Sequence, residues 1–237
     1  MSTRLLCSGI SLAYVGSVYI LPGGRPNIND VSVIWRRVVG VCVFSAVIVF
    51  NMGIDVPQWT AINKGVVKSV LKAVLSLNLL YAGSLLTKGF PSIKTGTKLE
   101  QWNSIKSLLV GPITEELVYR GVLISIYLDN GLTSDQALSE NFLYFGLAHL
   151  HHGLMRWLNG EGAGKQICVQ SFMHFVMTSL FGTYACYLML RTGNIWPSVV
   201  SHLLCNLYGP PELSGTATYY FLTAGSVAAF AYSLKYI

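Results

Sequence analysis

Ionisable side chains interrupt apolar stretches of this 237-residue chain, and the first cluster comprises Glu115, Glu116 and Arg120. Such charges are costly inside a membrane unless they are paired or wetted, so each is a functional candidate. Glu116 and Arg120 are four residues apart and are expected to pair along one helix face, whereas Glu115 points about 100° away. Pro112 predicts a helix start here, with both carboxylates in the first turn. An interfacial salt bridge would explain Glu116 and Arg120, but not Glu115.

A second cluster follows Phe145, where His149, His151 and His152 end an apolar stretch. Phe145 and His149 share one helix face at a spacing of four residues. His149 and His152 are three apart, which leaves a zinc site open, although the HExxH pattern is absent. We expect His149 to face a cavity and the other two histidines to lie at the water interface.

The third cluster pairs His202 with Asn206, again four residues apart, so that both present donors to the same spot. The alternative is an interhelical polar contact worth about 1 kcal/mol. Cys205 lies three residues after His202, which keeps a cysteine protease open, although buried cysteines are usually inert and Glu115 would go unused. His174 is interpreted as a packed, hydrogen-bonded histidine.

The elements that position these residues must suit a membrane. Hydrophobic residues make up 52% of the chain and charged residues 11%, with a mean hydropathy of +0.52. This excess over soluble proteins excludes a soluble enzyme, a disordered tail or a nucleic-acid-binding domain. We predict one all-α membrane domain over residues 1–237, with about eight spans that enclose a polar catalytic cavity. The candidate spans are 5–21, 38–54, 66–86, 107–128, 141–150, 166–190, 194–208 and 216–234.

Span length and charge give further expectations. The stretches 141–150 and 194–208 are too short to cross a bilayer comfortably, which points to an internal cavity around them. The stretch 5–21 resembles a signal peptide but is interpreted as a retained span. With the N-terminus on the non-cytoplasmic side, nine basic residues fall in cytoplasmic loops and six on the other side, which places the three clusters near the cytoplasmic side. The net charge of +6 is assigned to basic residues in loops. The five cysteines form no CxxC pattern, so disulfides are not expected.

The ordered patterns EExxxR, FxxxH and HxxxN, within about residues 101–211, resemble the type II CAAX endopeptidases of the CPBP intramembrane protease family. The resemblance implies an eight-helix fold in the endoplasmic reticulum membrane, open to the cytosol. It implies removal of the C-terminal -AAX tripeptide from prenylated CaaX proteins, such as small GTPases. Nucleic acid is not an expected partner, whereas membrane lipid is.

The same resemblance assigns roles to individual residues. Glu115 would deprotonate the attacking water, which His149 helps to bind, and His202 with Asn206 would form the oxyanion hole. Glu116, Arg120 and Phe145 would support them, with no metal or cofactor. Two further alternatives stay open: a related CPBP protease that acts on unprenylated peptides, and a channel or transporter, although no repeated half is visible.

Overall fold

The computed structural model describes residues 2–19, 30–53, 56–210 and 216–237. Every regular element in these ranges is helical and none is a strand, so the predicted all-α class is confirmed for this part of the chain. The elements, in chain order, are α1 Thr3–Ser17, α2 Val31–Asn51, α3 Val56–Thr60, α4 Lys64–Lys88, α5 Lys98–Ile105, the π-helix η1 Lys106–Val110, α6 Gly111–Glu116, the π-helix η2 Leu117–Val122, α7 Leu123–Asp129, α8 Ser134–Leu158, α9 Gly164–Thr192, α10 Trp196–Tyr208, α11 Ala217–Ser233 and the 3₁₀-helix η3 Leu234–Tyr236.

Three of the described helices, α2, α4 and α9, are long and apolar enough to cross a membrane. Their exposed surfaces carry large apolar side chains, such as Val47 on α2, Leu75 on α4 and Phe172 on α9. Apolar residues that face outward along a whole helix are typical of contact with lipid rather than water. The chain is therefore a membrane protein.

The predicted short span at 141–150 is wrong, because α8 runs for 25 residues from Ser134 to Leu158. A capping box formed by Thr133 and Gln136 starts this helix well before its apolar part. Polar residues occupy both ends of α8, so hydropathy alone reveals only its middle. The other expected short span, 194–208, corresponds to α10, which is short as predicted and has 13 residues.

The predicted helix start at Pro112 is also wrong, because the chain is helical without a break from Lys98 to Asp129. Proline lacks an amide hydrogen and disrupts the normal α-helical ladder. The π-helix η1 accommodates it: the Gly111 amide donates to the carbonyl of Lys106, five residues back. With the same five-residue spacing, the carbonyl of Ser107 would accept from the amide of Pro112, which has no hydrogen. The Ser107 carbonyl is therefore available to a donor from elsewhere. The carboxylates consequently lie inside a continuous helix, not at a free N-terminus.

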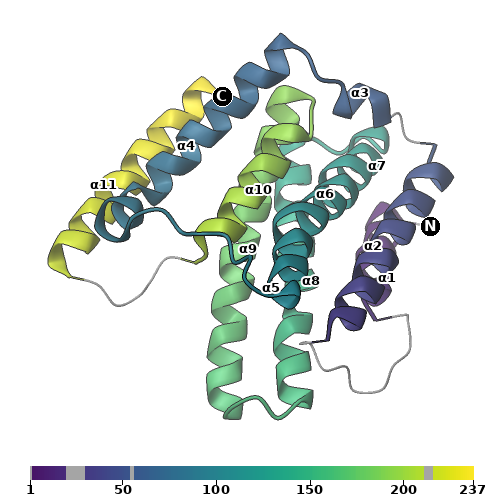
Figure 1. Cartoon of the computed structure of the whole chain (residues 1–237). Helices are drawn as coiled ribbons and strands as arrows, with labels where there is room; N and C mark the ends of the chain where they lie inside the picture. The colour runs from purple at the N-terminus through teal and green to yellow at the C-terminus, as the bar shows by residue number, and fades with distance from the viewer. Residues whose placement is uncertain (1, 20–29, 54–55, 211–215) are drawn as a thin grey trace.

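Figure 1 shows α4 and α11 side by side at one flank, α1 and α2 at the other, and α10 with the 98–129 helix between them. The α8–α9 hairpin extends beyond the other helices. Its two helices approach closely: a Cβ added at Gly146 would lie 1.9 Å from the hydroxyl of Ser179, and one at Gly153 would lie 1.9 Å from that of Ser171. Glycine at these positions thus holds α8, which carries His149, tightly against α9.

Candidate active site

The carboxylate of Glu115 lies between two imidazole rings from different helices. Its Oε2 atom is 3.6 Å from Nε2 of His149 on α8 and 3.9 Å from Nε2 of His202 on α10. This oxygen is buried and has no hydrogen-bond partner among the described residues. Both distances exceed a direct hydrogen bond, but one water molecule could bond to all three atoms. The tertiary structure thus brings together one residue from each of the three sequence clusters.

The orientation of His149 is fixed by its own helix. Nδ1 of His149 lies 2.7 Å from the carbonyl oxygen of Phe145, one turn earlier on α8. A carbonyl only accepts hydrogen bonds, so Nδ1 carries the proton in this contact. In the neutral ring Nε2 then presents a lone pair toward Glu115, which suits it to accept a proton or a hydrogen bond.

A buried charge network orients His202. Its Nδ1 lies 2.8 Å from Oε1 of Glu116, and Oε2 of Glu116 lies 3.1 Å from Nε of Arg120. The Glu116 and Arg120 side chains are both 0% exposed, and the pair that their spacing predicted is present. Arg120 also donates to the carbonyl of Gly182 on α9 at 3.2 Å. This network turns Nε2 of His202 toward Glu115.

The ring of Phe145 contacts both histidines and the buried arginine. It lies 4.1 Å from the guanidinium carbon of Arg120, and its centroid is 4.6 Å from that of His149. Cation–π contacts of this kind strengthen when both partners are removed from water. Gly182 lets α9 approach the ring, because a Cβ added there would lie 3.0 Å from Cβ of Phe145. Phe145 therefore contacts both His149 and the buried Arg120.

Asn206 follows His202 by one turn of α10, and its side chain is exposed. Its Nδ2 donates to the carbonyl of Ser107 at 2.8 Å, the carbonyl that the π-helix before Pro112 leaves without a backbone donor. This bond ties α10 to the helix that carries Glu115. The amide nitrogen has a second hydrogen that is available to a ligand.

The remaining histidines gather beside His149. Ring centroids of His149, His152 and His174 are 5.5–5.9 Å apart in every pairing. The ring of His174 packs against His149 and His152, as the interpretation of a packed residue expects, through an α8–α9 pairing that the sequence does not reveal. The residue is nevertheless exposed, and its side chain makes no hydrogen bond among the described residues. Within the described ranges, no three His, Cys, Asp or Glu side chains are grouped so as to hold a metal ion.

The cysteine alternative finds no support in this geometry. Cys205 packs against a core cluster of Ala73, Leu77, Tyr184 and Leu188, between α4 and α9. His202 instead directs its two nitrogens to Glu116 and Glu115. A nucleophile needs a base within hydrogen-bond reach, and no hydrogen bond between Cys205 and His202 occurs in the described part of the chain.

Comparison with known proteins identifies the same region. Residues 99–208 match the profile of a family described as "Type II CAAX prenyl endopeptidase Rce1-like". This range contains Glu115, Glu116, Arg120, His149 and both residues of the third cluster. No solved structure matches the chain.

Several curated proteins are similar over larger shares of the sequence. "Probable CAAX prenyl protease 2" of Schizosaccharomyces pombe is 29% identical, over 97% of this chain and 92% of its own length. "CAAX prenyl protease 2" of Homo sapiens is 25% identical, over 87% of this chain and 70% of its own length. The Saccharomyces cerevisiae protein of that name is 30% identical, over 61% of this chain and 50% of its own length.

Proposed function

We propose that the chain is a member of the type II CAAX prenyl endopeptidase family. It removes the C-terminal -AAX tripeptide from prenylated CaaX proteins, such as small GTPases, with water activated by Glu115. The observation that carries the chemistry is the buried, unpaired Oε2 of Glu115, with one imidazole nitrogen 3.6 Å and another 3.9 Å away. A carboxylate with two nearby imidazoles supplies the groups needed to activate and position water.

In the proposed reaction, a single water molecule donates two hydrogen bonds. One goes to the carboxylate of Glu115 and the other to Nε2 of His149. Its free lone pair then attacks the carbonyl carbon of the peptide bond that precedes the -AAX tripeptide. Glu115 takes the proton as the bond forms and returns it to the leaving amine when the tetrahedral intermediate collapses. The ionised carboxylate is regenerated, so the cycle needs no further reactant.

His202 is the proposed donor to the developing oxyanion, together with the second amide hydrogen of Asn206. Because Nδ1 of His202 contacts the Glu116 carboxylate, its proton belongs on that nitrogen. Nε2 therefore donates only when the ring is the imidazolium. With that charge, the cluster of Glu115, Glu116, Arg120 and His202 sums to zero, which favours burial of all four groups.

The prenyl group explains why such a protease would reside in a membrane, since this lipid partitions into the bilayer and brings the soluble protein's tail to the site. We place the protein in the endoplasmic reticulum membrane with the site open to the cytosol. The excess of basic residues in the loops on that side supports the orientation. Catalysis without a metal is part of the proposal.

The test uses the purified chain in lipid nanodiscs and a matched pair of CaaX peptides, one prenylated and one not. Mass spectrometry of the released tripeptide measures cleavage. We expect the prenylated peptide alone to be cleaved efficiently, and Glu115→Gln to abolish the release. Glu161→Gln is the matched control, because Glu161 is an exposed carboxylate in the turn between α8 and α9.

Each contrary outcome has a distinct meaning. Failure to release the tripeptide under any lipid condition would overturn the assignment. Equal cleavage of both peptides would instead indicate a CPBP protease that acts on unprenylated substrates. Loss of activity on replacing Cys205 with alanine, with Glu115→Gln still active, would move the reaction to the cysteine.

A further inference from the structure

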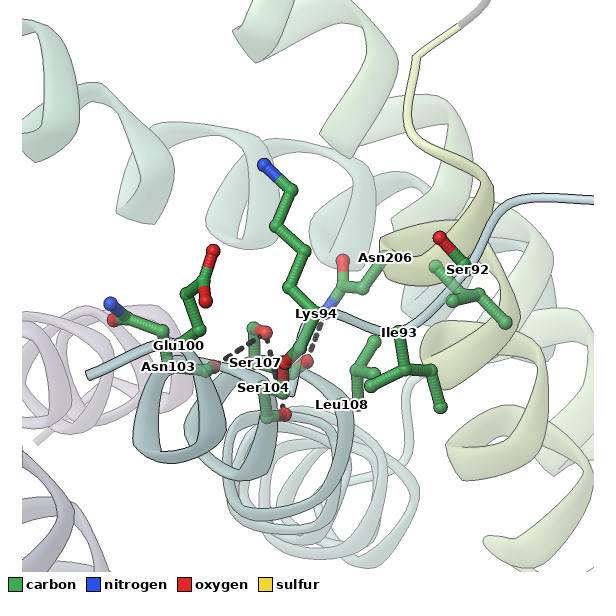
Figure 2. Close-up of a pocket in the computed structure, with 10 residues that line it drawn as sticks. Ser92, Ile93, Lys94, Glu100, Asn103, Ser104, Ser107, Leu108 and Asn206 are labelled. Atoms are coloured by element: carbon green, nitrogen blue, oxygen red, sulfur yellow. Dashed lines mark hydrogen bonds between the residues drawn. The ribbon is translucent and has the colours of Figure 1, made fainter. Parts of the chain in front are cut away.

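A polar pocket of about 400 Å³ opens beside Asn206. Its wall is formed by three segments: the loop before α5, which contributes Lys94, the first part of the 98–129 helix, which contributes Ser107, and the end of α10, which contributes Asn206 (Figure 2). The hydroxyl of Ser104 donates to the carbonyl of Lys94 at 2.8 Å, which fixes the loop against α5. The proposed mechanism uses Asn206 but no other side chain of this pocket.

Lys94 supplies an exposed positive charge to the pocket. Its ammonium group has no ion-pair partner among the described residues, although Glu100 lines the same pocket. The carboxylate of Glu100 is engaged elsewhere: Oε2 accepts hydrogen bonds from the amide of Thr97 at 2.9 Å and from its hydroxyl at 3.2 Å. These bonds, the backbone one first, hold the pKa of Glu100 below its usual value, and the charge of Lys94 adds a smaller effect in the same direction. In Figure 2 the side chain of Lys94 is drawn between Glu100 and Asn206.

The distance from the reacting bond to this pocket suits a tripeptide. Asn206 lies one helical turn beyond His202, a rise of about 6 Å. Three extended residues span at most about 10 Å. A peptide whose scissile carbonyl lies at His202 and whose last three residues run toward the C-terminal end of α10 would place its C-terminal carboxylate at or beyond Asn206, in the pocket that Lys94 lines.

We propose that this pocket binds the α-carboxylate of the substrate's last residue through Lys94, and so sets the cut three residues from the C-terminus. This inference rests on the proposed endopeptidase function. A cation in a partly enclosed polar pocket recognises a carboxylate by a charge-assisted hydrogen bond. An internal peptide segment carries no such charge, so the site distinguishes chain ends from loops.

The test compares two prenylated CaaX peptides of identical sequence, one with a free C-terminal carboxylate and one with a C-terminal carboxamide. Steady-state kinetics are measured by mass spectrometry for the wild type and for Lys94→Ala, Lys94→Arg and Lys98→Ala. We expect the wild type to have a KM about fivefold to tenfold lower for the free acid, with similar kcat. A contact that is equally strong in the ground and transition states changes KM and not kcat.

The variants separate a carboxylate site from a general structural role. Lys94→Ala should bring the two KM values together, Lys94→Arg should preserve their difference, and Lys98→Ala should behave as the wild type because Lys98 lies outside the pocket. Wild-type cleavage of both peptides with equal KM, or an unchanged preference in Lys94→Ala, would overturn the carboxylate site alone. Cleavage of neither peptide by the wild type would overturn the proposed function and this site with it.

Discussion

The buried pair of Glu116 and Arg120 should make Arg120 indispensable for stability. Replacing Arg120 with methionine keeps an apolar chain of similar length but removes the guanidinium from the buried Glu116 carboxylate, so that of the partners Arg120 and His202 only His202 remains. Removing one partner of a buried ion pair costs about 3–5 kcal/mol. The lost contact between the guanidinium and Phe145, 4.1 Å apart, adds to this cost. For a chain of this size, about 1 kcal/mol lowers the melting temperature by roughly 2–4 °C. We therefore expect a fall of about 6 °C or more.

The assay is thermal unfolding of the purified variants in one detergent, followed by intrinsic tryptophan fluorescence. The chain offers a matched control in the Arg4–Glu140 ion pair, which is 2.7 Å long but has Arg4 74% exposed. An exposed pair contributes about 0–1 kcal/mol, so Arg4→Met should lower the melting temperature by no more than a few degrees. The contrast between the two arginines measures the effect of burial on otherwise similar ion pairs.

A third variant separates stability from activity. In Glu116→Leu/Arg120→Met both charges are absent, and such apolar replacements are often neutral or stabilising. This double variant should recover much of the lost melting temperature yet remain inactive, because His202 loses the carboxylate that orients it. If Arg120→Met unfolded at the same temperature as the wild type, the reasoning from burial would be refuted. An active double variant would refute the orienting role of Glu116.

Three further predictions concern catalysis. Glu115→Ala and His149→Ala should each abolish cleavage while the protein stays folded, and the double variant should be no worse, since both residues act on one water; substantial activity in Glu115→Ala would assign the base to another group. Asn206→Ala should lower kcat by about 10²–10³-fold with little change in KM if it donates to the oxyanion; a normal kcat with a raised KM would make it a substrate anchor. Enzyme treated extensively with a chelator should keep its activity, and elemental analysis should find well under one zinc per chain. The reason is that His149 has one nitrogen engaged with Phe145 and the other directed at Glu115. Stoichiometric zinc whose removal abolished cleavage and whose return restored it would overturn the glutamate mechanism.

The sequence alone determined those features that depend on neighbours along one helix. The high apolar content requires a membrane environment, and helices satisfy their own backbone hydrogen bonds there. Spacing of four residues places Glu116 beside Arg120 whatever the tertiary structure, and the ion pair is present. The same local rule separates Glu115 from Glu116. Motif order carries the resemblance to the type II CAAX prenyl endopeptidases, because three patterns in the correct order are far more specific than any one of them.

Only the tertiary structure decided what lies between helices. Glu115 meets His149 and His202 through contacts over 34 and 87 positions in the chain, which depend on how the helices pack. The sequence shows a proline at position 112, but not the π-helix that accommodates it. The Ser107 carbonyl, which this π-helix leaves without a backbone donor, accepts a hydrogen bond from Asn206 because α10 packs beside it. Hydropathy missed the ends of α8, because a helix pairing with α9 tolerates polar termini that a lipid-exposed span would not. Helix geometry is set by hydrogen bonds over four residues, whereas the site is set by side-chain packing between distant segments, which no local pattern encodes.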